Sequence, residues 1–177
     1  MTIANNITLA RLLIAEISFI FIIVNMFHVG FVLLLVAILL DIVDGKVARR
    51  MKQVSKPGIF LDIMADKIVI ISAFLVVGLK INLIFFYLGL LMLLREYAMD
   101  TMRSIAASKG KVISSDKFSK IKGWLFMISV VGMLGCFTFF GSILELQNFM
   151  ILVGITGMVM AYITLVRFLI IYRKLIL

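Results

Sequence analysis

Residues 29–79 read VGFVLLLVAILLDIVDGKVARRMKQVSKPGIFLDIMADKIVIISAFLVVGL, two apolar segments separated by a strongly basic connection. A helix needs about 20 predominantly apolar residues to cross the hydrocarbon core of a bilayer. Both segments approach this length, and the pair Pro57-Gly58 lies where a loop should pass into the second of them. This stretch therefore predicts two membrane-spanning helices joined by a short basic loop.

The rest of the chain has the same character. Of its 177 residues, 64% are hydrophobic and only 15% are charged, whereas a soluble domain is about half apolar and a quarter charged. So much apolar surface cannot be buried inside so small a globule, so we expect lipid to surround it. Window hydropathy predicts six transmembrane helices, at residues 9–27, 29–47, 59–79, 82–104, 121–140 and 146–170. With no linker or repeat visible, residues 1–177 are expected to form one all-α, polytopic membrane domain.

The charge distribution predicts an orientation. The formal net charge is +9, from 18 Lys and Arg against 9 Asp and Glu. The cations gather in the connections after the second and fourth apolar segments and at the C-terminal end, while the other connections carry few. By the positive-inside rule, both termini and both basic connections face the cytoplasm of a cell (inner or plasma) membrane. Loops that face anionic lipid explain the excess charge, so no nucleic-acid partner is expected.

Four aspartates lie in or at the edge of these apolar helices, where a carboxylate is costly and usually functional. Asp41 and Asp44 are spaced i, i+3, and Asp62 and Asp66 are spaced i, i+4, so each pair lies on one face of its helix. Two such faces at the same membrane depth would form a pocket of oxygen ligands, which Mg²⁺ or Mn²⁺ prefers. Four carboxylates can hold two ions, an arrangement that clamps phosphates in substitution reactions.

Ion pairing and ion transport are alternative roles for the aspartates. They could form structural ion pairs with the neighbouring cations Lys46, Arg49 and Lys67. The chain could also be a small cation transporter. Transporters usually place such acids near the bilayer midplane on interrupted helices, often in inverted repeats. Here the acids lie near one side of the membrane and no repeat is visible.

Small residues accompany the aspartates. Gly45 and Ala48 follow the first pair, and Gly58 precedes Asp62 by one turn. Small residues on a helix let another backbone or a ligand approach closely. Beside carboxylates and Arg49, they suggest a flat ligand lying against the helix.

The spacing D-x2-DG-x2-AR-x8-G-x3-D-x3-D over residues 41–66 resembles the signature of the CDP-alcohol phosphotransferases at every fixed position. The resemblance implies transfer of a phosphoalcohol group from a CDP-linked lipid to an alcohol, with release of CMP. It implies that Asp41, Asp44 and Asp62 bind metal and that Asp66 faces the metals as general base. It also implies a homodimer. The residues assigned to the nucleotide are Asp44, Gly45, Ala48, Arg49 and Gly58.

A second set of residues resembles the bacterial phosphatidylglycerophosphate synthases of that family. It comprises Arg95-Glu96-Tyr97-Ala98 with Arg103, the pair Lys120-Ile-Lys122, and Asn5-x-x-Thr8-x-x-Arg11. The resemblance implies that CDP-diacylglycerol is the donor and glycerol-3-phosphate the acceptor. A dianionic acceptor needs cations, and the candidates are Arg95, Arg103, Lys117, Lys120 and Lys122.

The sequence departs from this second pattern in places. Ala4 stands where a proline is usual, and Asp100 introduces an acid beside the expected acceptor site. If Asp100 pairs with Arg103, one cation is lost from the acceptor set. Phosphatidylserine, phosphatidylinositol-phosphate and cardiolipin synthases therefore remain alternatives within the same family.

Overall fold

The structure is a computed structural model that describes residues 3–50, 56–110, 117–141 and 143–176. Within its helices, only the backbone is described for residues 3–4, 42–50, 56–57, 59, 117–120 and 172–176. These residues form six helices and no strand: α1 (Ile3–Ile23), α2 (Phe27–Arg50), α3 (Lys56–Lys80), α4 (Leu83–Ser108), α5 (Lys117–Phe140) and α6 (Leu144–Ile176). The predicted all-α architecture with six helices is confirmed.

The helix boundaries differ from the hydropathy windows mainly at polar ends. Helix α1 begins at Ile3 rather than residue 9, and α6 continues to Ile176 rather than residue 170, because polar residues outside an apolar window can still be helical. One predicted boundary was wrong, since the window 9–27 runs through a turn. Asn25 adopts φ 66° there, a left-handed conformation that asparagine tolerates, and α1 has already ended at Ile23.

The surface of the bundle is that of a polytopic membrane protein. Large apolar side chains point outward from every helix, with Leu13, Leu39 and Leu152 each at least 60% exposed. Among the described residues, Asn5–Ile23, Ile121–Phe140 and Leu144–Ile171 are long and apolar enough to cross a membrane. Helices α2, α3 and α4 contain ionisable residues but have 24 to 26 residues each. At 1.5 Å per residue they also exceed the roughly 30 Å of the hydrocarbon core.

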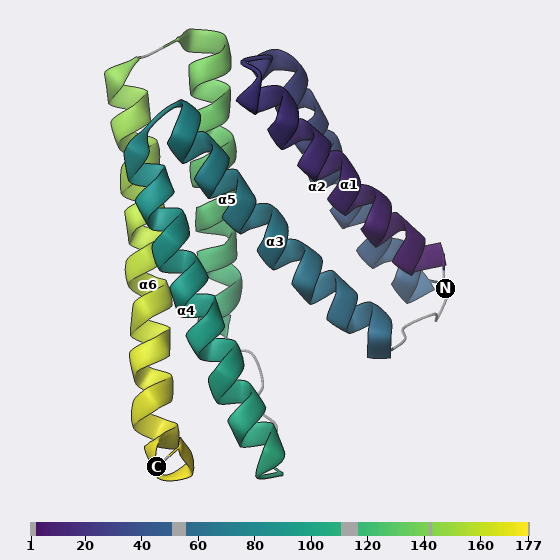
Figure 1. Cartoon of the computed structure of the whole chain (residues 1–177), viewed down its shortest axis with the longest axis vertical. Helices are drawn as coiled ribbons and strands as arrows, with labels where there is room; N and C mark the ends of the chain where they lie inside the picture. Colours follow the sequence, from purple (N-terminus) through teal and green to yellow (C-terminus); the bar gives the residue numbers. More distant parts are fainter. Residues whose placement is uncertain (1–2, 51–55, 111–116, 142, 177) are drawn as a thin grey trace.

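Helix α3 connects the two halves of the bundle. Figure 1 shows α1 and α2 side by side on one flank, α4, α5 and α6 on the other, and α3 crossing obliquely between them. Helix α3 packs on α1 as well as on α4 and α5. In Figure 1 the N-terminal end of α1 lies about halfway down the picture on the right, a little above the first turn of α3, whereas the C-terminal end of α6 and the last turn of α4 lie at the bottom. Side chains on α3 can therefore meet α1 on one side and α4 on the other.

Close packing fixes these helix faces. The Phe74 ring of α3 stacks on Phe85 of α4 at 5.4 Å and meets Phe126 of α5 edge-on at 5.6 Å. Between α1 and α2, Ser18 Oγ donates to the Gly30 carbonyl at 2.9 Å. A Cβ at Gly30 would lie 2.5 Å from Ile22 Cγ1, so this close approach requires glycine. It holds the last turns of α1 against the first turn of α2.

Candidate active site

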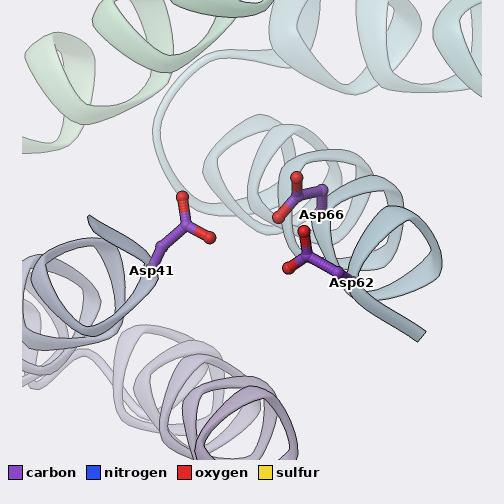
Figure 2. Close-up of side chains that lie close together, drawn as sticks. All are labelled: Asp41, Asp62 and Asp66. Atoms are coloured by element: carbon purple, nitrogen blue, oxygen red, sulfur yellow. The ribbon is translucent and has the colours of Figure 1, made fainter. Parts of the chain in front are cut away.

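Three of the four predicted aspartates converge between α2 and α3. Asp41 reaches from α2, Asp62 and Asp66 reach from α3, and Figure 2 shows their carboxylates directed toward one another. One oxygen of each lies within 4.8 Å of the others. The i, i+4 spacing on α3 therefore places both of its aspartates on the face toward α2, as the sequence predicts.

This carboxylate cluster could hold a metal ion. All of its donors are carboxylate oxygens, which suit hard divalent cations. The side chains of Asp41, Asp62 and Asp66 are 34%, 47% and 55% exposed, so the cluster is open on one side. An ion with its own water ligands, or a phosphate group, could enter from that side.

Arg11 of α1 closes the other side of the cluster. Its side chain is 5% exposed and lies inside the bundle. Nη2 is 3.0 Å from Asp62 Oδ1, Nη1 is 2.7 Å from Asp66 Oδ1, and Nη1 also donates to Asp41 Oδ1. One buried cation therefore contacts all three carboxylates. Sequence reasoning placed Arg11 in the second resemblance but gave it no role at the aspartates, because nothing in a linear pattern shows which helix faces α2 and α3.

Several predicted residues lie outside the described side chains. Asp44, Gly45, Ala48 and Arg49 belong to the part of α2 for which only the backbone is described, as do Lys117 and Lys120 in the first turn of α5. Helix α2 continues to Arg50, so Asp44 follows Asp41 by about one turn on the same helix. Gly58 is half-buried near the start of α3, one turn before Asp62.

A second polar cluster surrounds Arg95 on α4. Arg95 is 3% exposed. Its Nε donates to the Ala161 carbonyl at 3.2 Å and its Nη2 to Thr164 Oγ1 at 2.9 Å, both on α6. The remaining nitrogen, Nη1, donates to Glu96. The guanidinium predicted to bind the acceptor is thus held on α6 by two of its nitrogens and presents the third toward Glu96.

Glu96 joins the predicted acceptor cations. Lys122 of α5 donates from Nζ to Glu96 Oε1 at 3.1 Å, and both side chains are almost fully buried, at 11% and 12% exposure. Arg103 is close enough to Lys122 for the two cations to repel each other. Its Nε is buried with no hydrogen-bond partner among the described residues. The structure therefore brings together Arg95, Arg103 and Lys122, three of the five cations named from the sequence.

Lys67 connects this cluster to α3. Its Nζ lies 2.6 Å from both carboxylate oxygens of Asp100 and 3.5 Å from Glu96 Oε2. In the described residues Lys67 thus pairs with α4 rather than with the aspartates beside it, so the ion-pairing alternative is wrong for Lys67. Asp100 likewise pairs with Lys67, not with Arg103. Sequence reasoning missed Lys67 and Glu96 as members of this cluster, although Glu96 lies within the quoted run 95–98.

Comparisons with known proteins place the sequence beside one enzyme family. The family model described as CDP-alcohol phosphatidyltransferase matches residues 1–166. A CDP-diacylglycerol–glycerol-3-phosphate 3-phosphatidyltransferase of Bacillus subtilis is 33% identical over 105 residues, covering 59% of this chain and 54% of that protein. One from Mycoplasma pneumoniae is 32% identical over 120 residues, covering 68% and 52%. One from Wigglesworthia glossinidia brevipalpis is 31% identical over 111 residues, covering 58% of each chain. This chain spans about half the length of the curated relatives that it matches.

Proposed function

We propose that this chain, which belongs to the CDP-alcohol phosphatidyltransferase family, transfers the phosphatidyl group of CDP-diacylglycerol to glycerol-3-phosphate. The products are phosphatidylglycerophosphate and CMP. The observation that carries the proposal is the convergence of Asp41, Asp62 and Asp66 beside a second cluster that is rich in buried cations. The names of the relatives support the choice of donor and acceptor.

The carboxylate cluster would hold one or two Mg²⁺ or Mn²⁺ ions, with Asp44 as the fourth ligand inferred from its place one turn after Asp41. Bound there, such ions would neutralise the diphosphate of the donor and the CMP leaving group. Gly45, Ala48 and Arg49 follow on the same helix and are proposed to line the nucleotide site. Gly58 would leave space for the nucleotide on α3.

Asp66 is proposed as the general base. Its side chain is the most exposed of the three, at 55%, so an acceptor hydroxyl can reach it. Asp66 would take the hydroxyl proton as the acceptor oxygen bonds to phosphorus and the bond from phosphorus to the CMP oxygen breaks. Arg11 would keep the Asp66 carboxylate oriented from the buried side, since its Nη1 donates to Asp66 Oδ1 at 2.7 Å.

The acceptor would bind through its phosphate at the second cluster. Three cations, Lys67, Arg95 and Lys122, contact the carboxylates Glu96 and Asp100. The charge of Arg103 acts on Lys122 and adds a fourth. This leaves an excess of two positive charges among the described side chains. A phosphate monoester, close to a dianion at neutral pH, matches that excess. A neutral acceptor would leave it uncompensated in a half-buried site, which is costly.

The active site is proposed to face the cytoplasm of the cell membrane, with both termini on that side. The basic connections after α2 and α4 support this orientation through the positive-inside rule. The donor lipid would then enter from the bilayer, and glycerol-3-phosphate from the aqueous side. Assembly as a homodimer is a further proposal that rests on the family resemblance.

The experiment is an acceptor panel with purified protein in lipid nanodiscs. CDP-diacylglycerol is supplied with glycerol-3-phosphate, serine, inositol-1-phosphate or phosphatidylglycerol, and both CMP release and the lipid product are measured. Fastest turnover with glycerol-3-phosphate is expected. Faster turnover with another acceptor would reject the acceptor assignment and leave the reaction class intact. No CMP release with any acceptor would reject the reaction class itself and favour cation transport.

A further inference from the structure

Glu96 occupies the place that an anionic acceptor would need. Its Oε1 accepts from Lys122 Nζ at 3.1 Å and from Arg95 Nη1. Arg95 Nε and Nη2 are already bonded to Ala161 and Thr164 on α6. Nη1 is thus the Arg95 nitrogen directed toward Lys122, and Glu96 covers it. A phosphate could take both of these donors only if the carboxylate withdrew.

Another cation, Lys67, is within reach of Glu96 if its carboxylate withdraws from Arg95 and Lys122. Its other oxygen, Oε2, already lies 3.5 Å from Lys67 Nζ. The Lys67 ammonium is held in place by both oxygens of Asp100 at 2.6 Å. An ammonium has three N–H donors, so Lys67 can serve both carboxylates. Glu96 therefore need not become an unpaired buried charge when it leaves Arg95 and Lys122.

We propose that Glu96 is an internal substitute for the acceptor's phosphate and a determinant of acceptor specificity, and this rests on the function proposed above. In the free protein its carboxylate pairs with both Arg95 and Lys122. When a phosphorylated alcohol binds, the phosphate takes these two donors and Glu96 shifts toward Lys67. Because the exchange replaces one anion by another, a neutral alcohol cannot drive it.

The energetics favour a dianion over other ligands. Buried cations without an anion are costly, so no ligand gains by displacing Glu96 unless it supplies at least equal negative charge. A phosphate offers three terminal oxygens and nearly two charges, compared with two oxygens and one charge for the carboxylate. The free energy gained on acceptor binding is the amount by which Arg95 and Lys122 bind phosphate more strongly than they bind the Glu96 carboxylate. This difference sets a threshold that excludes neutral and weakly anionic acceptors.

The test measures ligand binding rather than turnover. The full chain in nanodiscs, with chelator and without CDP-diacylglycerol, is titrated calorimetrically with glycerol-3-phosphate, inorganic phosphate and glycerol. The variant is Glu96→Gln, which removes the competing charge and keeps the shape. The matched control is Glu145→Gln, which makes the same change of charge at an exposed acid in the first turn of α6, outside both clusters. We expect Glu96→Gln to bind glycerol-3-phosphate and phosphate about tenfold more tightly, and Glu145→Gln to change affinity by less than about threefold.

A second variant distinguishes a specific effect on phosphate binding from a loss of folded protein. Glu96→Asp keeps the charge but shortens the side chain by one methylene, so the carboxylate can no longer cover both donors fully. Glu96→Asp should also bind phosphate more tightly than the wild-type protein does, but by a smaller factor than Glu96→Gln. Weaker phosphate binding in either variant, once size-exclusion profiles show that it folds, would mean that Glu96 organises the cations instead of competing for them. That result would overturn the proposal, as would unchanged affinity.

The controls also separate this inference from the proposed function. Suppose that Glu96→Gln binds inorganic phosphate more tightly, while the wild-type protein binds glycerol-3-phosphate no better than glycerol. The exchange at Glu96 is then supported and the acceptor assignment is rejected. If wild-type protein turns over glycerol-3-phosphate and Glu96→Gln binds it more weakly, the acceptor assignment stands and the exchange is rejected.

Discussion

Arg11 Nη1 lies 2.7 Å from Asp66 Oδ1, so a buried cation of α1 directly contacts the proposed base on α3. The same guanidinium reaches Asp62 at 3.0 Å and Asp41 on α2. Three like charges confined within 4.8 Å repel one another strongly unless a cation lies among them. Arg11 supplies that cation from the protein side, and bound metal ions would supply it from the open side.

Arg11→Gln should therefore destabilise the chain most when metal is absent. Removing one partner of a fully buried ion pair costs about 3–5 kcal/mol. The aspartates are partly exposed and screened, so we expect about 1–2 kcal/mol, or a Tm lower by roughly 3–8 °C in chelator. Saturating Mg²⁺ should reduce the Tm difference between Arg11→Gln and the wild-type protein, because the ion supplies the missing positive charge. Thermal unfolding with and without Mg²⁺ measures both values.

Lys80→Gln is the matched control, because it removes a cation at the far end of α3, away from the aspartates. Its Tm should respond to Mg²⁺ as the wild-type Tm does. If Arg11→Gln lost equal stability in Mg²⁺ and in chelator, Arg11 would be a packing element with no electrostatic link to the metal cluster.

Activity should require Mg²⁺ or Mn²⁺. The donors that converge in the cluster are all carboxylate oxygens, which bind these ions well. Purified protein treated with excess chelator should lose CMP release, and added Mg²⁺ should restore it. Asp41→Ala should raise the Mg²⁺ concentration needed for half-maximal activity and weaken metal-dependent CDP-lipid binding. Full turnover in chelator would reject the metal site.

Asp66→Asn should separate binding from chemistry. The amide keeps the side-chain shape but cannot accept the acceptor's proton, so kcat should fall by roughly 10²–10⁴-fold. CDP-lipid affinity should change by less than about tenfold if the other aspartates carry most of the metal. Glu145→Gln in the exposed first turn of α6 is the matched control and should retain most of kcat. Equal losses of CDP-lipid binding in Asp66→Asn and Asp41→Ala would contradict the separate roles.

Hydropathy and spacing predicted the helix number and the shared face of Asp62 and Asp66 because these depend on residues close in sequence. Segments of apolar residues locate helices, and i, i+4 spacing places Asp62 and Asp66 on one face. The end of α1 was misplaced because Asn25 forms a left-handed turn within an apolar run. Such a turn depends on one residue's conformation, which a hydropathy average does not detect.

The contacts of Arg11, Lys67 and Glu96 could not be predicted in this way. Each depends on how one helix is rotated against another, and such rotations depend on distant packing, for example Ser18 of α1 against Gly30 of α2 or Phe74 of α3 against Phe85 of α4. Lys67 follows Asp66 in sequence, yet Asp66 contacts α1 and Lys67 contacts α4. Successive residues are about 100° apart around a helix, so their side chains point to different neighbours. Proximity in sequence therefore suggested the wrong partner for Lys67.

The orientation in the membrane can be checked with single cysteines in a Cys136→Ser background. Asn25 lies in the turn between α1 and α2, and Ser108 lies at the other end of the bundle, in the last turn of α4. We expect Asn25→Cys to react with an impermeant thiol reagent added to intact cells. Ser108→Cys should react only after permeabilisation, because the positive-inside rule places this end in the cytoplasm. The reverse pattern would invert the proposed topology.

Lys122→Met should impair use of the acceptor selectively. Lys122 Nζ bonds to Glu96 at 3.1 Å beside Arg95, and a phosphate that replaces Glu96 would accept from the same ammonium. A lost charge-assisted hydrogen bond is worth about 1.5–3 kcal/mol, so the KM for glycerol-3-phosphate should rise by roughly one to two orders of magnitude. The KM for CDP-diacylglycerol should move little, since the carboxylate cluster is unchanged. Lys80→Gln, far from both clusters, should alter neither constant. If Lys122→Met raised the two KM values equally, the loss would reflect general disruption of the bundle and not a phosphate contact.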